Sequence, residues 1–367
     1  MSFPDTLVED RRAAAAQALG IGLDRRSAAD LAVITTISVV YFLDFVAVLF
    51  MLWNRRYPPI KAKSPLLMAS LFAASALWFA GDVQMNGHVT LAGTPMERCR
   101  GLGFWVRILA GICGVCALFA LRSFALFHVF RLNRPFRGLR LYVPIMGYVT
   151  CIAAYGIAAL VLKPGSTLYY VASLDLCSSA VPFKATVFAF IWATLAVVGF
   201  NYWRIRHITS SFNESREMGC ACLTILATML FQTLVHFLHP QYPLSLAYRV
   251  VSTVLSHLCT NVIWWGVMAV PLWNCAFRKQ RYLDKWVAKL RMDGLQREYC
   301  VEECEYTPAD IAMNEAVLRQ QGGGLLKTGD DFYYACEGDG GQRERSLSWL
   351  HSRDSKDAGF GGDRYLL

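Results

Sequence analysis

Charged residues are scarce in this chain. Of its 367 residues, only 17% are Asp, Glu, Lys or Arg, whereas 55% are hydrophobic. Soluble globular domains usually carry about 25% charged residues. The shortage of charge therefore excludes an ordinary soluble domain and points to a chain that is largely surrounded by lipid.

Motifs of enzymatic chemistry are also missing. The sequence contains no HExxH motif, no paired aspartate motif and no histidine cluster within its apolar stretches. Its intramembrane cysteines lack the spacing to histidine that metal ligands require. We therefore expect no enzymatic activity, no metal and no cofactor. The last apolar stretch contains no lysine, which argues against a retinal protein, because that chromophore is held as a lysine Schiff base.

Seven long apolar stretches account for most of the chain. At a rise of about 1.5 Å per helical residue, each is long enough to cross a hydrocarbon layer of about 30 Å. Lipid offers no partner for a free backbone group, so we predict an all-α, seven-transmembrane helix bundle. The stretches are Ala32 to Trp53, Ser64 to Asn86, Leu102 to Phe130, Leu141 to Leu162, Pro182 to Trp203, Gly219 to His239 and Tyr248 to Trp273.

Basic residues alternate between the links that join these stretches. The first, third and fifth links carry eleven Lys and Arg residues, against five on the other side of the membrane. Because positive loops stay in the cytoplasm, we predict an external amino terminus and a cytoplasmic carboxyl terminus. Arg25 and Arg26, just before the first stretch, favour the opposite orientation. The chain has a net charge of +9. We expect these basic residues to set the orientation in the membrane and to contact anionic lipid, and we expect no binding of nucleic acid.

The chain divides into four parts. Residues 1–30 form a short external segment, and residues 31–275 form the transmembrane domain. Residues 276–293 alternate basic and apolar side chains and predict an amphipathic helix on the inner membrane surface, with an ordinary solvated helix as the alternative. Residues 294–367 are acidic, then Gly-rich, then rich in Ser and Arg, which is typical of a disordered tail. We expect a multi-pass protein of the plasma membrane.

Cysteines differ by their predicted side of the membrane. Only Cys99 and Cys177 fall on the outer side, where an oxidising environment permits a disulfide between them. Two free thiols are the alternative. Cys275, at the inner end of the last stretch, is a candidate for palmitoylation.

Polar side chains inside the spans are costly, so they mark candidate sites. Asp82 and Arg107 lie near the outer ends of neighbouring helices, which predicts a salt bridge that contacts a ligand or only fixes the packing. Trp192, Gln232, His236 and His257 could complete a pocket in the bundle, although hydrogen bonds between helices are the more common role of such residues.

Several local motifs occur in the order found in one receptor family. They are IKAKSP before the second span, WFAGD within it, CRGLGFW at the start of the third, LCSS in the fourth link and FNESR at 212–216. Together they resemble the seven-helix module of class C G-protein-coupled receptors, closest to the GABA-B-like branch, over about residues 60–275. The family's bilobed ligand-binding domain has no counterpart in the roughly 30 residues before the first span. At 270–273, VPLW keeps the family's proline but not the following lysine.

This resemblance implies a receptor that passes an external signal to a heterotrimeric G protein, with an unknown ligand and a homodimeric or heterodimeric assembly. Arg122 lies near the family's basic residue low in the third helix, but the sixth span offers no acid to pair with it, so Glu214 or Glu217 could replace that partner. Ser346 and Ser348 follow arginines and are candidates for phosphorylation. A seven-span transporter or channel is the alternative function. The candidate residues for G-protein coupling are Arg122, Arg131, Arg134, Asn213, Glu214 and Arg216.

The predicted topology can be tested at a glycosylation sequon. Asn213-Glu214-Ser215 matches the acceptor pattern, but the predicted orientation keeps it in the cytosol, away from the glycosylation machinery. Treating the protein expressed in eukaryotic cells with peptide N-glycosidase should therefore leave its gel mobility unchanged. A mobility shift that disappears in an Asn213→Gln variant would reverse the orientation.

Overall fold

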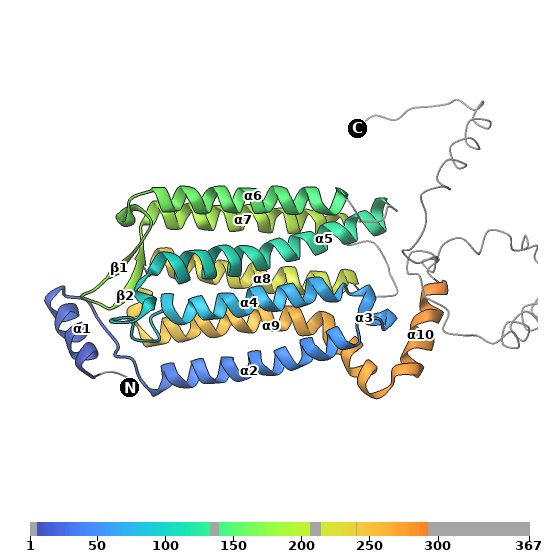
Figure 1. Cartoon of the computed structure of the whole chain (residues 1–367), viewed down its shortest axis with the longest axis horizontal. Coiled ribbons are helices and arrows are strands. Elements are labelled where there is room, and N and C mark those ends of the chain that lie inside the picture. The colour runs from blue at the N-terminus through green and yellow to red at the C-terminus, as the bar shows by residue number, and fades with distance from the viewer. Residues whose placement is uncertain (1–5, 133–138, 206–213, 240, 293–367) are drawn as a thin grey trace, which may run out of the picture. The chain divides into compact units, whose positions relative to one another are not determined.

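The computed structural model describes residues 6–132, 139–205, 214–239 and 241–292, and this part of the chain is mostly helical. Within it, seven helices are long and apolar enough to cross a membrane, which confirms the predicted bundle (Figure 1). These helices are α2 (Ala28–Trp53), α4 (Pro65–Met85), η2 (Arg100–Cys113) continued by α5 (Gly114–Leu132), α6 (Leu139–Val161), α7 (Val181–Ile205), α8 (Glu214–Leu238) and α9 (Leu246–Phe277).

Burial differs strongly between the spans. Half of the most apolar window of α9 is buried inside the protein, but only 11% of the corresponding window of α6 is buried. Figure 1 accordingly shows α9 beside α4 and α2, while α6 lies beside α7 at one side of the bundle. Large apolar side chains such as Val143, Val161 and Phe200 remain exposed on the spans. Lipid would cover them in a membrane protein of this kind.

Local sequence explains where the first two spans begin. Ser27 caps α2: its hydroxyl accepts a hydrogen bond from the Ala29 amide, and the Asp30 carboxylate accepts one from the Ser27 amide at 3.0 Å. This reciprocal pair is a capping box. Pro65 begins α4 at a position where a missing N–H costs nothing.

The first half of the third span, η2, is a π-helix, which was not predicted. It packs against α4 so closely that only glycine fits at two positions. A Cβ added at Gly111 would lie 2.7 Å from the Cα of Trp78, and one added at Gly81 would lie 2.8 Å from the Cα of Arg107. These two glycines permit a close approach of the helices, which brings Arg107 directly against α4.

One end of the bundle carries the link between Cys99 and Cys177 and is called here the disulfide end. The helix α1 (Thr6–Ala18) lies at this end together with a two-stranded antiparallel hairpin, β1 (Leu168–Val171) and β2 (Leu176–Ser179) (Figure 1). The short 3₁₀ turns η1 (Pro95–Glu97), η3 (Pro164–Ser166) and η4 (Tyr242–Leu244) complete the loops. Neither α1 nor the hairpin was predicted from the sequence.

The opposite end carries α3 (Pro58–Ala62) and α10 (Lys279–Met292). The helix predicted over 276–293 thus exists, but part of its apolar side packs on the protein. Trp286 is 6% exposed, and Tyr282 and Leu283 pack against the apolar cluster of this half. The Tyr57 hydroxyl also donates to the Lys279 carbonyl at 2.9 Å.

The contact between α4 and the third span generates a prediction about stability. Gly111→Ala should lower the melting temperature, because forcing a methyl group into the Trp78 backbone costs about 1–3 kcal/mol, more than the gain of about 1 kcal/mol from replacing a helical glycine. Gly199→Ala is the matched control, since nothing lies within 4 Å of a Cβ at that position. Thermal unfolding of both variants in the same detergent checks this. Equal melting temperatures would contradict the packing.

Candidate functional site

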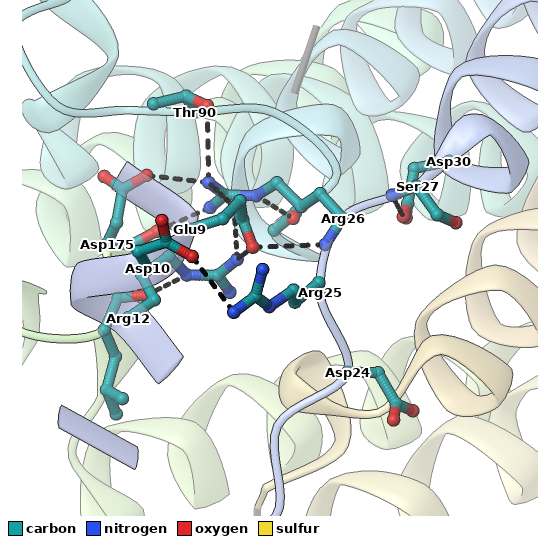
Figure 2. Close-up of polar contacts among 12 residues, drawn as sticks. Glu9, Asp10, Arg12, Asp24, Arg25, Arg26, Ser27, Asp30, Thr90 and Asp175 are labelled. Atoms are coloured by element: carbon teal, nitrogen blue, oxygen red, sulfur yellow. Dashed lines mark hydrogen bonds and ion pairs between the residues drawn. The ribbon is translucent and has the colours of Figure 1, made fainter. Parts of the chain in front are cut away.

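Four buried charged residues hold α1 to the bundle at the disulfide end. We call Glu9, Arg12, Arg26 and Asp175 the cap network (Figure 2). The Arg26 guanidinium pairs with Asp175 at 2.8 Å and with Glu9 at 3.1 Å. Glu9 also pairs with Arg12 at 2.7 Å. The two carboxylates and the two guanidinium groups thus neutralise one another, and all four side chains are buried from solvent.

Further hydrogen bonds connect the cap network to the loop after α4 and to the hairpin. Arg26 donates from Nε to the Gly87 carbonyl at 2.8 Å, and Arg12 donates from Nε to the Leu174 carbonyl at 2.7 Å. Asp175, which adopts a positive φ of 46° between the strands, accepts from the Ala92 amide at 2.8 Å and from the Tyr170 hydroxyl at 2.7 Å. The amino-terminal segment is therefore fixed to the hairpin and to the loop after α4.

Burial affects the titration of the groups in this region. It lowers the pKa of Arg12, and the neighbouring Arg26 lowers it further, while Glu9 acts in the opposite sense. Arginine nevertheless stays protonated at every physiological pH. Burial, together with the hydrogen bond to Asp175, raises the pKa of Tyr170. Arg12 and the Tyr170 hydroxyl therefore keep their protons across the physiological range.

A second chain of polar contacts, the axial network, begins at Asp30 on α2. Arg249 of α9 donates to both carboxylate oxygens of Asp30, from Nε to Oδ1 at 2.8 Å and from Nη2 to Oδ2 at 2.7 Å. The Nδ1 atom of His88 lies 2.8 Å from Oδ1 of the same carboxylate. The remaining Arg249 donors reach the carbonyls of Asp24 and Arg25 at 3.0 and 3.1 Å. The first span is thus joined to the last through one guanidinium group that donates four hydrogen bonds.

The axial network continues from the loop after α4 into the bundle. The other nitrogen of His88 lies 2.8 Å from the Thr253 hydroxyl, which also accepts from Asn86 at 2.7 Å. Arg107 then approaches the Asn86 side-chain oxygen at 3.4 Å and pairs with Asp82. The predicted salt bridge between Asp82 and Arg107 is therefore confirmed.

His257 of α9 completes the axial network. Its Nε2 lies 3.1 Å from the Asp82 carboxylate, and its Nδ1 lies 3.0 Å from the Tyr41 hydroxyl on α2. The network thus starts and ends on α2, at Asp30 and Tyr41, and crosses α4, η2 and α9 between them. At about 1.5 Å per residue, these two ends lie roughly 16 Å apart along the helix.

A cavity of about 240 Å³ lies beside the axial network. Its walls are mainly apolar side chains of η2, α7 and α8, including Ile108, Phe183 and Val187. Ile21 of the amino-terminal segment and Leu174 of the hairpin loop also contribute. Its polar groups include Arg107, Lys184, Gln232, His236 and Tyr242.

Three of the six predicted pocket residues line this cavity, namely Arg107, Gln232 and His236. Gln232 also joins α8 to α9, because its amide donates to the Ser256 hydroxyl at 2.8 Å. The other three do not line it. Asp82 and His257 belong to the axial network, and the Trp192 indole donates to Thr233 at 3.1 Å. Their polar atoms bond between helices, and a pocket role for these three residues stays a prediction.

Sequence reasoning missed several residues of this region. Lys184 and Arg249 were counted only as charges that report orientation, although a basic residue just inside a span already signals a buried partner or a ligand. For Asp30 and His88, the sequence contained no pattern that would have identified them as members of a buried network. Asp44, which had no assignable partner, accepts a hydrogen bond from the Trp265 indole at 2.8 Å.

The disulfide between Cys99 and Cys177 ties the start of the third span to β2, with their Cα atoms 5.7 Å apart. Cys177 lines the cavity, and it pairs in register with Tyr170 across the hairpin. The cross-link therefore fixes the hairpin over the cavity. Cys275, the candidate for palmitoylation, is 6% exposed within the apolar cluster of the opposite half, so its thiol is not presented for acylation in this structure.

At the opposite end, Arg122 is buried and donates to the Lys63 carbonyl at 3.1 Å. Lys63 in turn pairs with Glu217 of α8 at 2.8 Å. Arg122 is thus linked to Glu217 through Lys63, and a direct pair of Arg122 with Glu217 stays a prediction. Arg216 is exposed. The side chains of Arg131 and Glu214, together with Arg134, Asn213, Ser346 and Ser348, lie outside the described residues.

Among the described residues, no group of three or more His, Cys, Asp or Glu side chains could hold a metal ion. No family model matches the chain, and no curated protein matches it either.

Two adjacent arginines allow a matched test of the cap network. Arg26→Met should release α1, because removing one partner of a buried ion pair costs about 3–5 kcal/mol. Arg25→Met is the control: Arg25 pairs with Asp10, both side chains are more than 60% exposed, and such a pair contributes at most about 1 kcal/mol. Hydrogen–deuterium exchange over residues 6–18 should rise only in Arg26→Met. Unchanged exchange in both variants would refute the cap network.

Proposed function

We propose that this protein is a class C-like G-protein-coupled receptor of the plasma membrane, with the disulfide end outside. The observation that carries the proposal is the axial network, which links the first, second, third and seventh spans through buried charges. A receptor needs a bundle with two packing arrangements, one of which a ligand stabilises. Side chains that share protons and charges between spans are suited to that role, because a shift of one span changes the partners of the others.

The inner end supports the same proposal. Lys63 belongs to the link between the first two spans, and its pair with Glu217 ties that link to the start of α8, immediately after FNESR at 212–216. Arg122 of the third span donates to the Lys63 carbonyl. One lysine thus connects three elements that would face a G protein. This contact would take the place of a direct pair between Arg122 and an acid of the sixth span.

The alternative, a transporter or channel, has less support. A transported solute needs access from both ends of the bundle. The half opposite the cavity is filled by an apolar cluster that includes Met68, Phe119 and Met268, of which Met68 and Met268 are fully buried. A bundle that is filled in this half suits a bound signal better than a transported solute.

Nucleotide exchange tests the proposed receptor. Purified protein in nanodiscs should accelerate GTPγS binding to at least one member of a panel of Gα subunits in complex with Gβγ. Lys63→Gln should raise this basal rate severalfold, because it breaks the pair with Glu217 that holds the inner end closed. Lys61→Gln is the control, since Lys61 is exposed in the same link.

No acceleration with any Gα, by either the wild type or Lys63→Gln, would reject the receptor proposal. Solute flux through proteoliposomes that contain no G protein would favour the transporter instead.

A further inference from the structure

The charges that face the cavity are of one sign. Lys184 and Arg107 both line it, whereas no Asp or Glu does so among the residues that the structure describes. Arg107 shares its charge with Asp82. Within the described part of the chain, no carboxylate pairs with Lys184, whose Nζ donates only to the His236 carbonyl, at 3.3 Å. An ammonium group that is partly withdrawn from water with a single carbonyl partner is poorly compensated.

The polar groups converge on one side of the cavity. The His236 ring packs on the Tyr242 ring, with centroids 4.5 Å apart, and the Tyr242 hydroxyl donates to the Asn86 side chain at 3.3 Å. Arg107 approaches the same Asn86 oxygen. Lys184 and Arg107 are thus joined through His236, Tyr242 and Asn86, so the two cations flank one polar wall. An anionic group placed there would neutralise Lys184 and accept its hydrogen bonds.

The rest of the cavity is apolar. Ile108, Val187 and Ile191 are nearly fully buried, and Phe188 and Met229 extend the same surface from α7 and α8. Such walls bind an aliphatic or aromatic tail by removing it from water. The volume of about 240 Å³ is below the range of about 300–1,000 Å³ that is usual for pockets of drug-sized ligands. The cavity therefore suits a small molecule with one charged head and one short tail.

We infer that the cavity binds a small amphipathic carboxylate, with its carboxylate at Lys184 and its apolar tail between η2, α7 and α8. One unpaired lysine matches a single negative charge, whereas phosphate groups are usually held by several donors, often arginines. The inference deepens the proposed function, because such a molecule would be the signal that the receptor detects. Binding itself can be measured without any G protein.

The test uses three probes that share one tail and differ in charge: octanoate, octan-1-ol and octylammonium. Equilibrium dialysis of each labelled probe against the purified full-length protein in nanodiscs, corrected with empty nanodiscs, measures binding beyond partition into lipid. Octanoate should bind saturably to the wild type and at least tenfold more tightly than the other two. Equal or tighter binding of octan-1-ol or octylammonium, or no saturable octanoate binding, would overturn the inference without any variant.

Variants then locate the site. Lys184→Gln should weaken octanoate binding by about tenfold or more, and Lys184→Arg should restore most of it. Lys163→Gln removes the same charge from an exposed position in the loop that precedes the hairpin and should leave binding unchanged. Wild-type affinity in a folded Lys184→Gln variant would place the carboxylate elsewhere and overturn the inference. If octanoate binds as expected but no Gα responds, the ligand site stands and only the receptor proposal fails.

Discussion

The ion pair between Asp82 and Arg107 is the contact on which the arrangement of this bundle depends. Neither charge could be buried alone between helices, because an unpaired ion in a medium of low polarity loses far more hydration energy than packing returns. Their meeting requires α4 and η2 to approach closely, and Gly81, whose Cβ would clash with Arg107, permits this approach. His257 then binds the free side of the carboxylate and brings α9 to the same point. The ion pair, the close helix contact and the central position of α9 are thus consequences of one another.

The same principle extends from the bundle to the amino-terminal segment. Arg26 and Arg249 lie at the two edges of this segment's contact with the bundle, and each is neutralised by carboxylates from other elements. Glu9 and Asp175 balance Arg12 and Arg26, so α1 is held by charges that cancel locally. Since Ile21 lines the cavity, the segment held in this way is also part of the cavity wall. Leu174, whose carbonyl accepts from Arg12, lines the cavity as well, so the cap network holds two parts of the cavity wall in place.

The sequence predicted those features that a membrane imposes and missed those that depend on distant contacts. Seven spans followed from length and hydropathy, and the pair of Asp82 with Arg107 followed from the cost of charge in lipid. Arg26 was read only as a charge that bears on orientation, because its ion-pair partner Asp175 lies 149 positions away in a turn with positive φ. The strand Leu176–Ser179 was read as loop, since four residues pair only when Leu168–Val171 is already in place. His257 was named as a pocket candidate because a polar residue in a span marks a possible site, but the sequence does not show that Asp82 and Tyr41 are its partners.

Buried charges are compensated differently at the two ends of the bundle. This difference bears on how the proposed receptor could transmit a signal. At the disulfide end, charges are satisfied several times over, as Arg249 with one carboxylate and two carbonyls illustrates. At the opposite end, Arg122 reaches a backbone carbonyl, and the Lys63 side chain bridges to Glu217, whose side chain is 23% exposed. A pair that borders water is weaker than one enclosed by protein, since solvent screens it. The contact between Lys63 and Glu217 is therefore easier to break than the contacts at the disulfide end, as the proposed receptor requires of its G-protein face.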